Sequence, residues 1–176
     1  EALVRFGQQL DGSALLSKEA LKVSEAEFAA AFAEVEEVVL EAIRYGITNI
    51  RTFHEEQKPE TMWMKEIRPG AYAGDRLTTI RSVAIYVPRG KGAFPSVTMM
   101  TTVPGVVAEV PKLAIFTPPL PNGSVDAATL VAASIAGVDT VYKCGGAQAV
   151  AAAAFGTETV ERALKIVGPG SPWVVA

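Results

Sequence analysis

Residues 82–92 read SVAIYVPRGKG, in which five consecutive apolar residues are followed by proline, arginine and glycine. Three further short, mainly apolar runs end in a similar way, at residues 113–116, 140–142 and 165–167. An uninterrupted apolar run is typical of a strand that is buried on both faces of a parallel sheet. Helix-compatible segments separate the runs, at residues 96–108, 125–137 and 147–155. This order predicts successive βαβ units with right-handed crossovers, and hence an α/β fold with a Rossmann-like parallel sheet flanked by helices.

The chain ahead of this region has a helical period. Apolar residues recur there at three- and four-residue steps, at Val35, Val38, Val39, Ala42, Ile43 and Ile50. Ser24 followed by Glu27 is a capping-box pattern, and Lys58-Pro59 is expected to end the last helix. Short β-prone pieces then alternate with Pro69-Gly70 and Gly74-Asp75, which indicates a hairpin-like connector. We therefore divide the chain into a helical segment (1–60), a β connector (61–81) and a Rossmann-like domain (82–176).

Composition narrows the function classes. The chain has 176 residues, of which 49% are hydrophobic and 20% charged, as in an ordinary globular domain. A net charge of −3 gives no reason to expect nucleic acid or an anionic membrane as partner, and no apolar stretch is long enough to span a bilayer. The one cysteine excludes an intramolecular disulfide and is compatible with the reducing cytoplasm, where we expect the protein. Neither end has the chemistry of a natural terminus, so we expect an internal segment of a longer polypeptide.

Ligands of open parallel sheets bind beyond the carboxyl ends of the strands, where the Pro/Gly-rich loops of this chain lie. Gly145 and Gly146 open a helix directly after a strand, so their amides can approach a phosphate or carboxylate. Gln148, in the first helical turn, can hydrogen-bond a ribose or an amide. The alternative is that the two glycines only make a tight turn. The usual GxGxxG fingerprint with a distant acidic residue is absent.

Other candidate residues are less specific. Arg89 and Lys91 can hold an anion, although composition alone favours solvated loop charges, and the GxxxxGK[ST] phosphate loop is absent. His54, the single histidine, is expected near a helix end, and Cys144 as a small buried residue. One histidine and one cysteine cannot make a zinc site, and no nucleophile–base–acid set is present, so we assign no catalytic or metal-binding residue.

Several segments together resemble the histidinol dehydrogenase family. They are residues 143–152 (KCGGAQAVAA), 155–160 (FGTETV), 165–170 (KIVGPG), the YVP-x-GK turn at 86–91 and the IxxFHxxQ pattern at 50–57. The resemblance runs in order through essentially the whole chain. In three places the chain departs from the family pattern: Ser171 replaces the asparagine of GPGN, Arg89 replaces the first glycine of a PGG turn, and Pro172-Trp173 replaces the usual small-residue continuation.

The resemblance implies a homodimeric enzyme that oxidises an amino alcohol, L-histidinol, in two NAD-dependent steps to L-histidine, with a zinc ion that holds the substrate. It implies that residues 1–60 belong to a second domain, and that residues 82–176 form a nucleotide-binding domain truncated at its C-terminus. It places Tyr86, Gln148 and Ser171 at NAD-contacting positions, beside Gly145 and Gly146. The family's zinc ligands and catalytic Glu-His pair lie downstream, so we expect the 176-residue segment to be inactive alone.

Three functions stay open at this point. The first is a segment of a zinc- and NAD-dependent histidinol dehydrogenase. The second is a diverged family member that oxidises another amino or hydroxy alcohol, which the changes at Ser171 and Arg89 favour. The third, from another class, is a non-catalytic domain that binds a nucleotide or another subunit.

Overall fold

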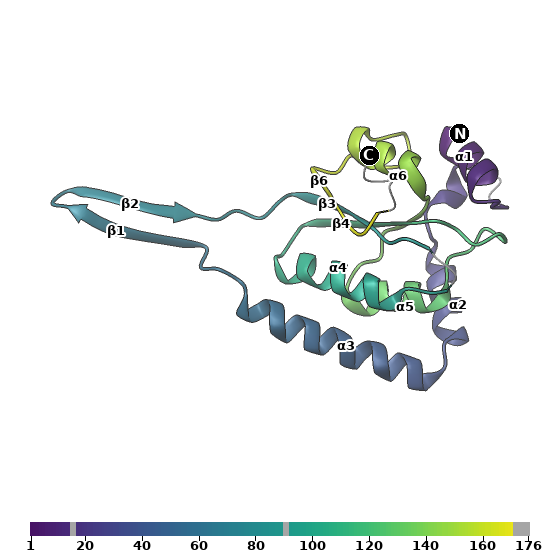
Figure 1. The fold of residues 1–176 in the computed structure, drawn as a ribbon, viewed down its shortest axis with the longest axis horizontal. Helices are drawn as coiled ribbons and strands as arrows, with labels where there is room; N and C mark the ends of the chain where they lie inside the picture. The colour runs from purple at the N-terminus through teal and green to yellow at the C-terminus, as the bar shows by residue number, and fades with distance from the viewer. Residues whose placement is uncertain (15–16, 90–91, 171–176) are drawn as a thin grey trace.

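The computed structural model describes residues 1–14, 17–89 and 92–170. Within them, four parallel strands form a sheet of order β5-β4-β3-β6. The strands are β3 (Ser82–Tyr86), β4 (Lys112–Thr117), β5 (Val141–Lys143) and β6 (Lys165–Val167). Helices cover both faces (Figure 1). The predicted α/β fold, a parallel sheet flanked by helices after an N-terminal helical part, is confirmed.

Each strand divides its side chains between two helical layers, because neighbouring residues of a strand point to opposite faces. Val83 and Ile85 pack in the core beneath α4 (Pro95–Val107) and α5 (Ala127–Ala136). The intervening Ala84, with Tyr86, packs instead beneath α6 (Gly146–Phe155), on the face that also carries α1 (Ala2–Leu10). Burial of β3 on both faces is the physical reason for its continuous apolar sequence.

Residues 25–56 of the helical segment pack onto the outside of the α4–α5 layer, whereas α1 lies beside α6 on the other face of the sheet. The segment contains α1, a short 3-10 helix (η1, Glu19–Leu21), α2 (Glu25–Glu34) and α3 (Glu37–Glu56). α3 packs on α4, and α2 on α5, within one hydrophobic cluster that includes the sheet. No helix of the described residues is long and apolar enough to cross a membrane.

The amino-terminal end of α2 is capped by its own side chains and is also joined to the sheet by an ion pair. The Ser24 hydroxyl accepts the Glu27 N–H at 3.3 Å, and the Glu27 carboxylate accepts the Ser24 N–H at 2.9 Å, which confirms the capping box. The other carboxylate oxygen of Glu27 pairs with the buried ammonium of Lys143 at the end of β5. Burial alone would raise the pKa of Glu27, but its bonds to Lys143 and Ser24 hold this pKa below the usual value. One carboxylate thus joins the helical segment to the sheet.

Only some of the apolar residues that recur at helical steps in the sequence face the core from α3. Leu40, Ile43 and Ile47 are buried, whereas the side chains of Val38 and Val39 are exposed. At about 100° per residue, Val38 lies on the side of α3 opposite Leu40, Ile43 and Ile47, which face the core.

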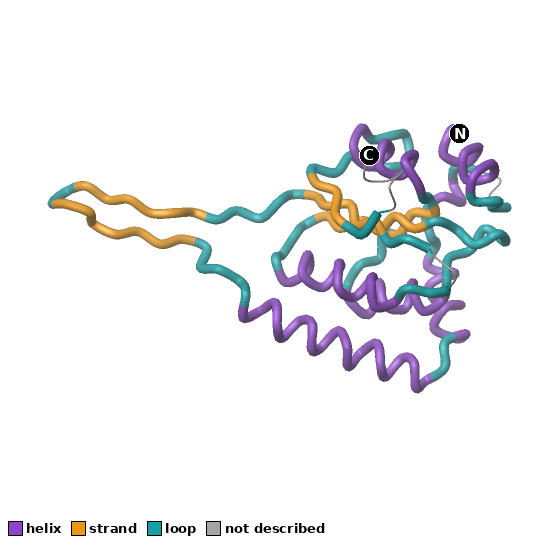
Figure 2. The backbone as a smooth tube through the Cα atoms, in the orientation of Figure 1, coloured by secondary structure: helices purple, strands orange, loops and turns teal. Residues whose placement is uncertain are grey.

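The connector forms a two-stranded antiparallel hairpin that projects from the body (Figures 1 and 2). It consists of β1 (Met62–Arg68) and β2 (Ala71–Arg76), joined by the Pro69-Gly70 turn. The second expected break, Gly74-Asp75, lies inside β2 instead. Gly74 is required there for another reason: a Cβ atom would lie 1.9 Å from the carbonyl oxygen of Trp63 on the partner strand.

Candidate functional site

The loops that follow the strands meet at the carboxyl edge of the sheet around Tyr86, the last residue of β3. Gly168, after β6, has a φ of +138°, and a Cβ atom there would lie 2.1 Å from the Tyr86 carbonyl oxygen. Gly145, after β5, is equally constrained, because its Cβ would lie 2.4 Å from Cγ of Pro118 in the loop after β4. Glycine at these positions lets backbone segments approach each other more closely than any side chain allows.

The hydroxyl of Tyr86 joins β3 to the start of α6. Its oxygen accepts the backbone N–H of Gly146 at 3.1 Å, and the residue is 7% exposed. Burial raises the pKa of Tyr86, and the hydrogen bond from the Gly146 N–H only partly opposes this, so the phenol keeps its proton. That proton remains available to donate to a ligand. The helix amino terminus is therefore not an array of free amides, as the sequence suggested, but carries a tyrosine hydroxyl bonded to one of them.

Gln148 lies one turn into α6 and is half-buried. Its amide oxygen is close to Gly146, at 2.7 Å from where a Cβ of that residue would be. The same side chain lines a hollow of about 660 Å³ between α1 and α6, together with Ala2, Leu3, Phe6, Ala152 and Phe155 among others. Gln148 thus borders both the Tyr86–Gly146 contact and an apolar space beside it.

Asp11, which our sequence analysis did not identify, belongs to the same site. It directly follows α1, and its Oδ2 atom is buried without a hydrogen-bond partner among the residues that the structure describes. Burial raises the pKa of Asp11, and the positive charge of Arg89 only partly opposes this. The sequence Leu-Asp-Gly after a helix indicates only a turn. No local signal shows that this turn packs over the edge of the sheet.

Arg89 is not a freely solvated charge. Its Nη1 atom donates to the carbonyl oxygen of Pro119 at 2.7 Å, which links the loop after β3 to the loop after β4. The residue also lines a hollow of about 310 Å³ with Phe94, Pro118 and Asp126. The guanidinium retains further donors for an anion, since it has five N–H groups. Lys91 and Ser171, the other predicted contacts, lie outside the described residues.

Cys144 is a buried residue and His54 lies near a helix end, as the sequence predicted. Cys144 is 3% exposed, and burial, helped by Asp11, raises the pKa of its thiol to about 12. It is therefore a neutral buried side chain rather than a nucleophile. His54 lies in the last turn of α3 and packs edge-on against Phe53, with 5.3 Å between ring centroids. Within the described ranges, no three His, Cys, Asp or Glu residues converge as a metal site would require.

Another hollow, of about 370 Å³, opens at the opposite edge of the sheet, between Ser82, Lys112 and Thr140 at the amino ends of the strands. Ligands of parallel α/β sheets bind at the carboxyl edge. The convergence of Tyr86, Gly146 and Asp11 there makes that edge the candidate site.

These features define a Rossmann-like α/β chain whose polar groups gather beyond the carboxyl ends of parallel strands. The chain belongs to the histidinol dehydrogenase family, because the family model described as "Histidinol dehydrogenase" matches residues 1–176. This confirms the resemblance seen in the sequence.

Individual relatives agree with this assignment. The chain is 74% identical over 175 residues to a protein named histidinol dehydrogenase homolog from Cereibacter sphaeroides, covering 99% of this chain and 40% of the relative. It is 46% identical over 155 residues to histidinol dehydrogenase from Methanosarcina mazei, covering 88% of this chain and 36% of the relative. A crystal structure of histidinol dehydrogenase from Elizabethkingia anophelis superposes with a TM-score of 0.92 at 34% identity, over 98% of this chain and 39% of that one. The chain thus spans about two-fifths of the length of these relatives.

Proposed function

We propose that the chain is the cofactor-binding part of a longer NAD-dependent alcohol dehydrogenase. Histidinol dehydrogenase, the enzyme after which the family is named, converts L-histidinol, through the aldehyde, to L-histidine. The observation that carries the proposal is the Tyr86–Gly146 hydrogen bond with Gly168 against the same tyrosine. It brings together two motifs that the resemblance assigns to NAD binding, although they are distant in sequence.

The residues at this edge fit a dinucleotide. The amino terminus of α6, a helix of ten residues, favours negative charge, and Gly146 presents no Cβ to a ligand. The Tyr86 hydroxyl can donate to a ligand oxygen while it holds Gly146, and the Gln148 amide can both donate and accept. NAD, when bound, supplies the hydride acceptor for alcohol oxidation. The role of this chain is then to bind and orient the cofactor.

Zinc does not fit the described residues, which offer no converging ligand set. We therefore derive no step from a metal held by this chain, and propose that the zinc ligands and the acid–base residues come from elsewhere in a polypeptide of full family length. The proposal includes a cytoplasmic homodimer, as the resemblance implies.

A second candidate is a related dehydrogenase that acts on another amino or hydroxy alcohol. Two observations favour it. The chain is 74% identical to a relative named only as a homolog, against 46% for one named histidinol dehydrogenase. In addition, Arg89 adds a cation next to the site, held by Pro119.

The deciding experiment is a dehydrogenase assay of a protein of full family length that carries this chain, with NAD and zinc. L-Histidinol is compared with a panel of other amino and hydroxy alcohols. Rapid turnover of histidinol supports the first candidate, and turnover of another alcohol alone supports the second. If no alcohol is oxidised while calorimetry still detects NAD binding, the chain is a nucleotide-binding module and both enzymatic proposals fail.

The role of Arg89 has its own test in that protein. We expect Arg89→Gly to change the substrate range or the preference between NAD and NADP. If both stay unaltered, Arg89 only joins two loops.

A further inference from the structure

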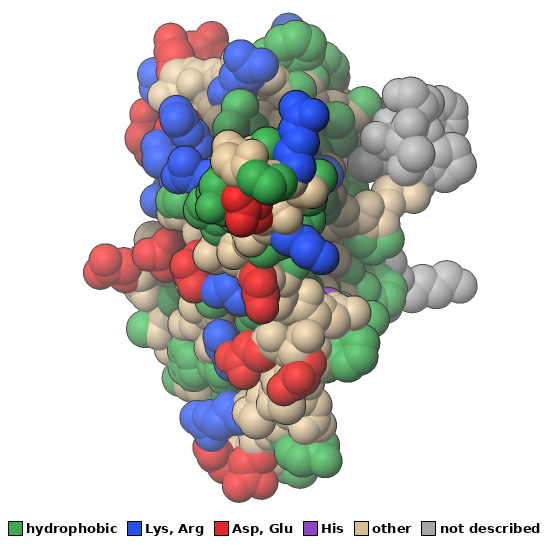
Figure 3. Space-filling view, turned by 90° about the vertical axis from the view of Figure 1, so that its left-hand side faces the viewer, with side chains coloured by type: hydrophobic (Ala, Val, Ile, Leu, Met, Phe, Trp, Pro, Cys, Tyr) green, Lys and Arg blue, Asp and Glu red, His purple; other side chains and the backbone are tan. Residues whose placement is uncertain are grey.

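Lys143, at the end of β5, is a cation in an unusual place. Lysine and arginine side chains mostly lie at the surface, as many do on the face that Figure 3 shows. Lys143 is instead 5% exposed, and no other lysine or arginine among the residues that the structure describes is buried. Its ammonium pairs with the carboxylate of Glu27 at the start of α2. A buried charge needs such a partner, because without one it loses its hydration uncompensated.

The helical segment contacts β5 at each of its three residues. The N–H of Val23 donates to the carbonyl oxygen of Val141 at 2.9 Å, and Lys22 forms an isolated antiparallel bridge with Tyr142. The ion pair of Lys143 is the third contact. β5 is the outermost strand of the described sheet, and these contacts lie along its open edge. The position of β5 is therefore set from both sides, by β4 within the sheet and by the helical segment outside it.

β5 leads directly into the turn at Gly145 and Gly146, which we call the glycine turn. Gly145 lies so close to Pro118 that a Cβ atom would be 2.4 Å from Cγ of the proline. The N–H of Gly146 donates to the Tyr86 hydroxyl, which fixes the other half of the turn. The ion pair at Lys143 is only two residues ahead of these contacts. A movement of Lys143 toward water must therefore be taken up by the glycine turn.

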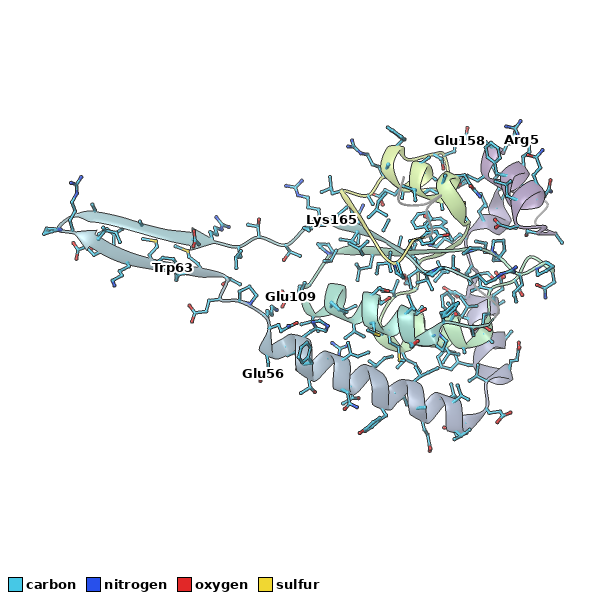
Figure 4. All side chains as sticks on the ribbon, viewed as in Figure 1. Arg5, Glu56, Trp63, Glu109, Glu158 and Lys165 are labelled. Carbon is cyan, nitrogen blue, oxygen red and sulfur yellow. The ribbon has the colours of Figure 1, made fainter. Side chains whose placement is uncertain are left out.

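The ion pair lies inside the packed body of the chain. Figure 4 shows side chains filling the layer between the sheet and the helices that cover it, whereas those of the hairpin, such as Trp63, stand apart from the body. Both members of the pair come from this chain, and the ammonium is enclosed by it. No further polypeptide is needed to complete the contact.

We propose that the Glu27–Lys143 pair positions the glycine turn, so that the docking of α2 on β5 controls cofactor affinity at the carboxyl edge of the sheet. The two are positioning residues, because they act on the ligand through the backbone between Lys143 and Gly146. The ligand is the nucleotide of the proposed function, on which this part of the proposal rests. The positioning of the turn itself rests only on contacts within the chain.

Thiol labelling of Cys144 reports the position of the turn in a protein of full family length that carries this chain. We expect Glu27→Gln to label the Cys144 peptide, followed by mass spectrometry, about tenfold faster or more, because the unpaired ammonium draws the adjacent turn toward water. The faster rate should not depend on low concentrations of urea. Urea-independent labelling reports a local opening, whereas a variant that is merely less stable is labelled through global unfolding, which urea accelerates.

Calorimetry with NAD is the second measurement. We expect Glu27→Gln to raise the dissociation constant for NAD about tenfold or more, in a protein that circular dichroism shows to be folded. Ser24→Ala is the matched control, since it removes the hydroxyl that caps the same helix but leaves the Glu27 carboxylate with Lys143. It should change neither NAD affinity nor the urea-independent labelling of Cys144.

A second substitution separates the unpaired charge from the loss of the glutamate. Glu27→Gln combined with Lys143→Met leaves no buried charge, so NAD affinity and Cys144 labelling should return most of the way to wild type. If Glu27→Gln does not fold, Glu27→Asp decides instead. Its shorter side chain weakens the pair but keeps the charge, so smaller increases in both quantities are expected.

Unchanged labelling in Glu27→Gln, equal effects in Ser24→Ala, or no rescue by Lys143→Met would each overturn the proposal. So would faster labelling with unaltered NAD affinity, because the turn would then move without consequence for the ligand. If the wild type itself binds no NAD, the proposed function fails, whereas faster urea-independent labelling of Cys144 in Glu27→Gln still supports the positioning of the turn.

Discussion

The backbone N–H of Gly146 donates to the hydroxyl oxygen of Tyr86 at 3.1 Å, although the two residues are 60 positions apart. This bond fixes the start of α6 against the end of β3. It also keeps the tyrosine hydroxyl at the edge where parallel sheets bind their ligands.

Replacing Tyr86 by phenylalanine removes the acceptor and leaves the Gly146 N–H without this partner. We expect a loss of about 1 kcal/mol in the free energy of unfolding, measured by urea denaturation. NAD binding by a protein of full family length should weaken as well. Tyr72→Phe, on the exposed β1–β2 hairpin, is the control and should change neither quantity. Equal stability and equal NAD affinity in Tyr86→Phe would refute the role given to this hydroxyl.

Gly168→Ala should be among the most damaging single changes in the chain. The new Cβ would lie 2.1 Å from the Tyr86 carbonyl oxygen, at a φ of +138° that alanine rarely adopts. We expect a loss of about 3 kcal/mol or more in thermal or urea unfolding. Gly7→Ala makes the same chemical change inside α1, where nothing lies within 4 Å, and should stabilise by about 0.5 kcal/mol. Similar effects at both sites would contradict the close approach at Gly168.

Glu27→Gln should destabilise the chain, because it leaves the buried Lys143 ammonium without its carboxylate. We expect a loss of about 2 kcal/mol at neutral pH, since the glutamate itself is partly exposed. The folded-state pKa of Glu27 is lowered, so its stabilisation is present above its unfolded value of 4.5 and is lost as the pH falls through the folded pKa. The difference between wild type and variant should therefore shrink in acid. A difference independent of pH would show that the ion pair contributes nothing.

Asp11→Asn should have the opposite pH dependence. Burial raises the folded pKa of this carboxyl, so the folded chain binds its proton more tightly than the unfolded chain does. The ionised form thus costs stability, and this cost grows as the pH rises from the unfolded value of 3.8 through the folded pKa. The variant should gain stability relative to wild type over that window, in urea unfolding at a series of pH values. Asp75→Asn, on the exposed β1–β2 hairpin, is the control and should follow wild type.

Cys144 should not react with a thiol reagent in the folded chain at neutral pH. It is 3% exposed, and burial raises the pKa of its thiol to about 12. The thiolate that such reagents require is therefore scarce as well as inaccessible. Colorimetric titration should detect one thiol in denaturant and none without it. Fast labelling of the folded chain would mean that the loop at Cys144 opens readily.

Much of the local structure could be predicted because its causes are local. Strand β3 is apolar at successive positions from Val83 onward, as burial on both faces explains. Ser24 and Glu27 cap α2 through bonds that span three residues. Two of the residues that the family resemblance assigned to cofactor binding, Tyr86 and Gln148, are brought together with Gly146 at one edge.

The remaining features depend on tertiary packing. Asp11 reads as a turn residue, and only the docking of α1 beside the sheet places its carboxylate near Tyr86 and Arg89. Which apolar residues of α3 face the core depends on how the helix docks, and this docking buries Leu40 and Ile43 but leaves Val38 exposed. Gly74 looked like a turn signal, but close contact between two strands requires it. The sequence by itself thus determined the elements, because hydrophobic period and capping act over a few residues. Only the tertiary structure decided which distant groups meet, because burial and charge depend on neighbours that the chain brings from far away.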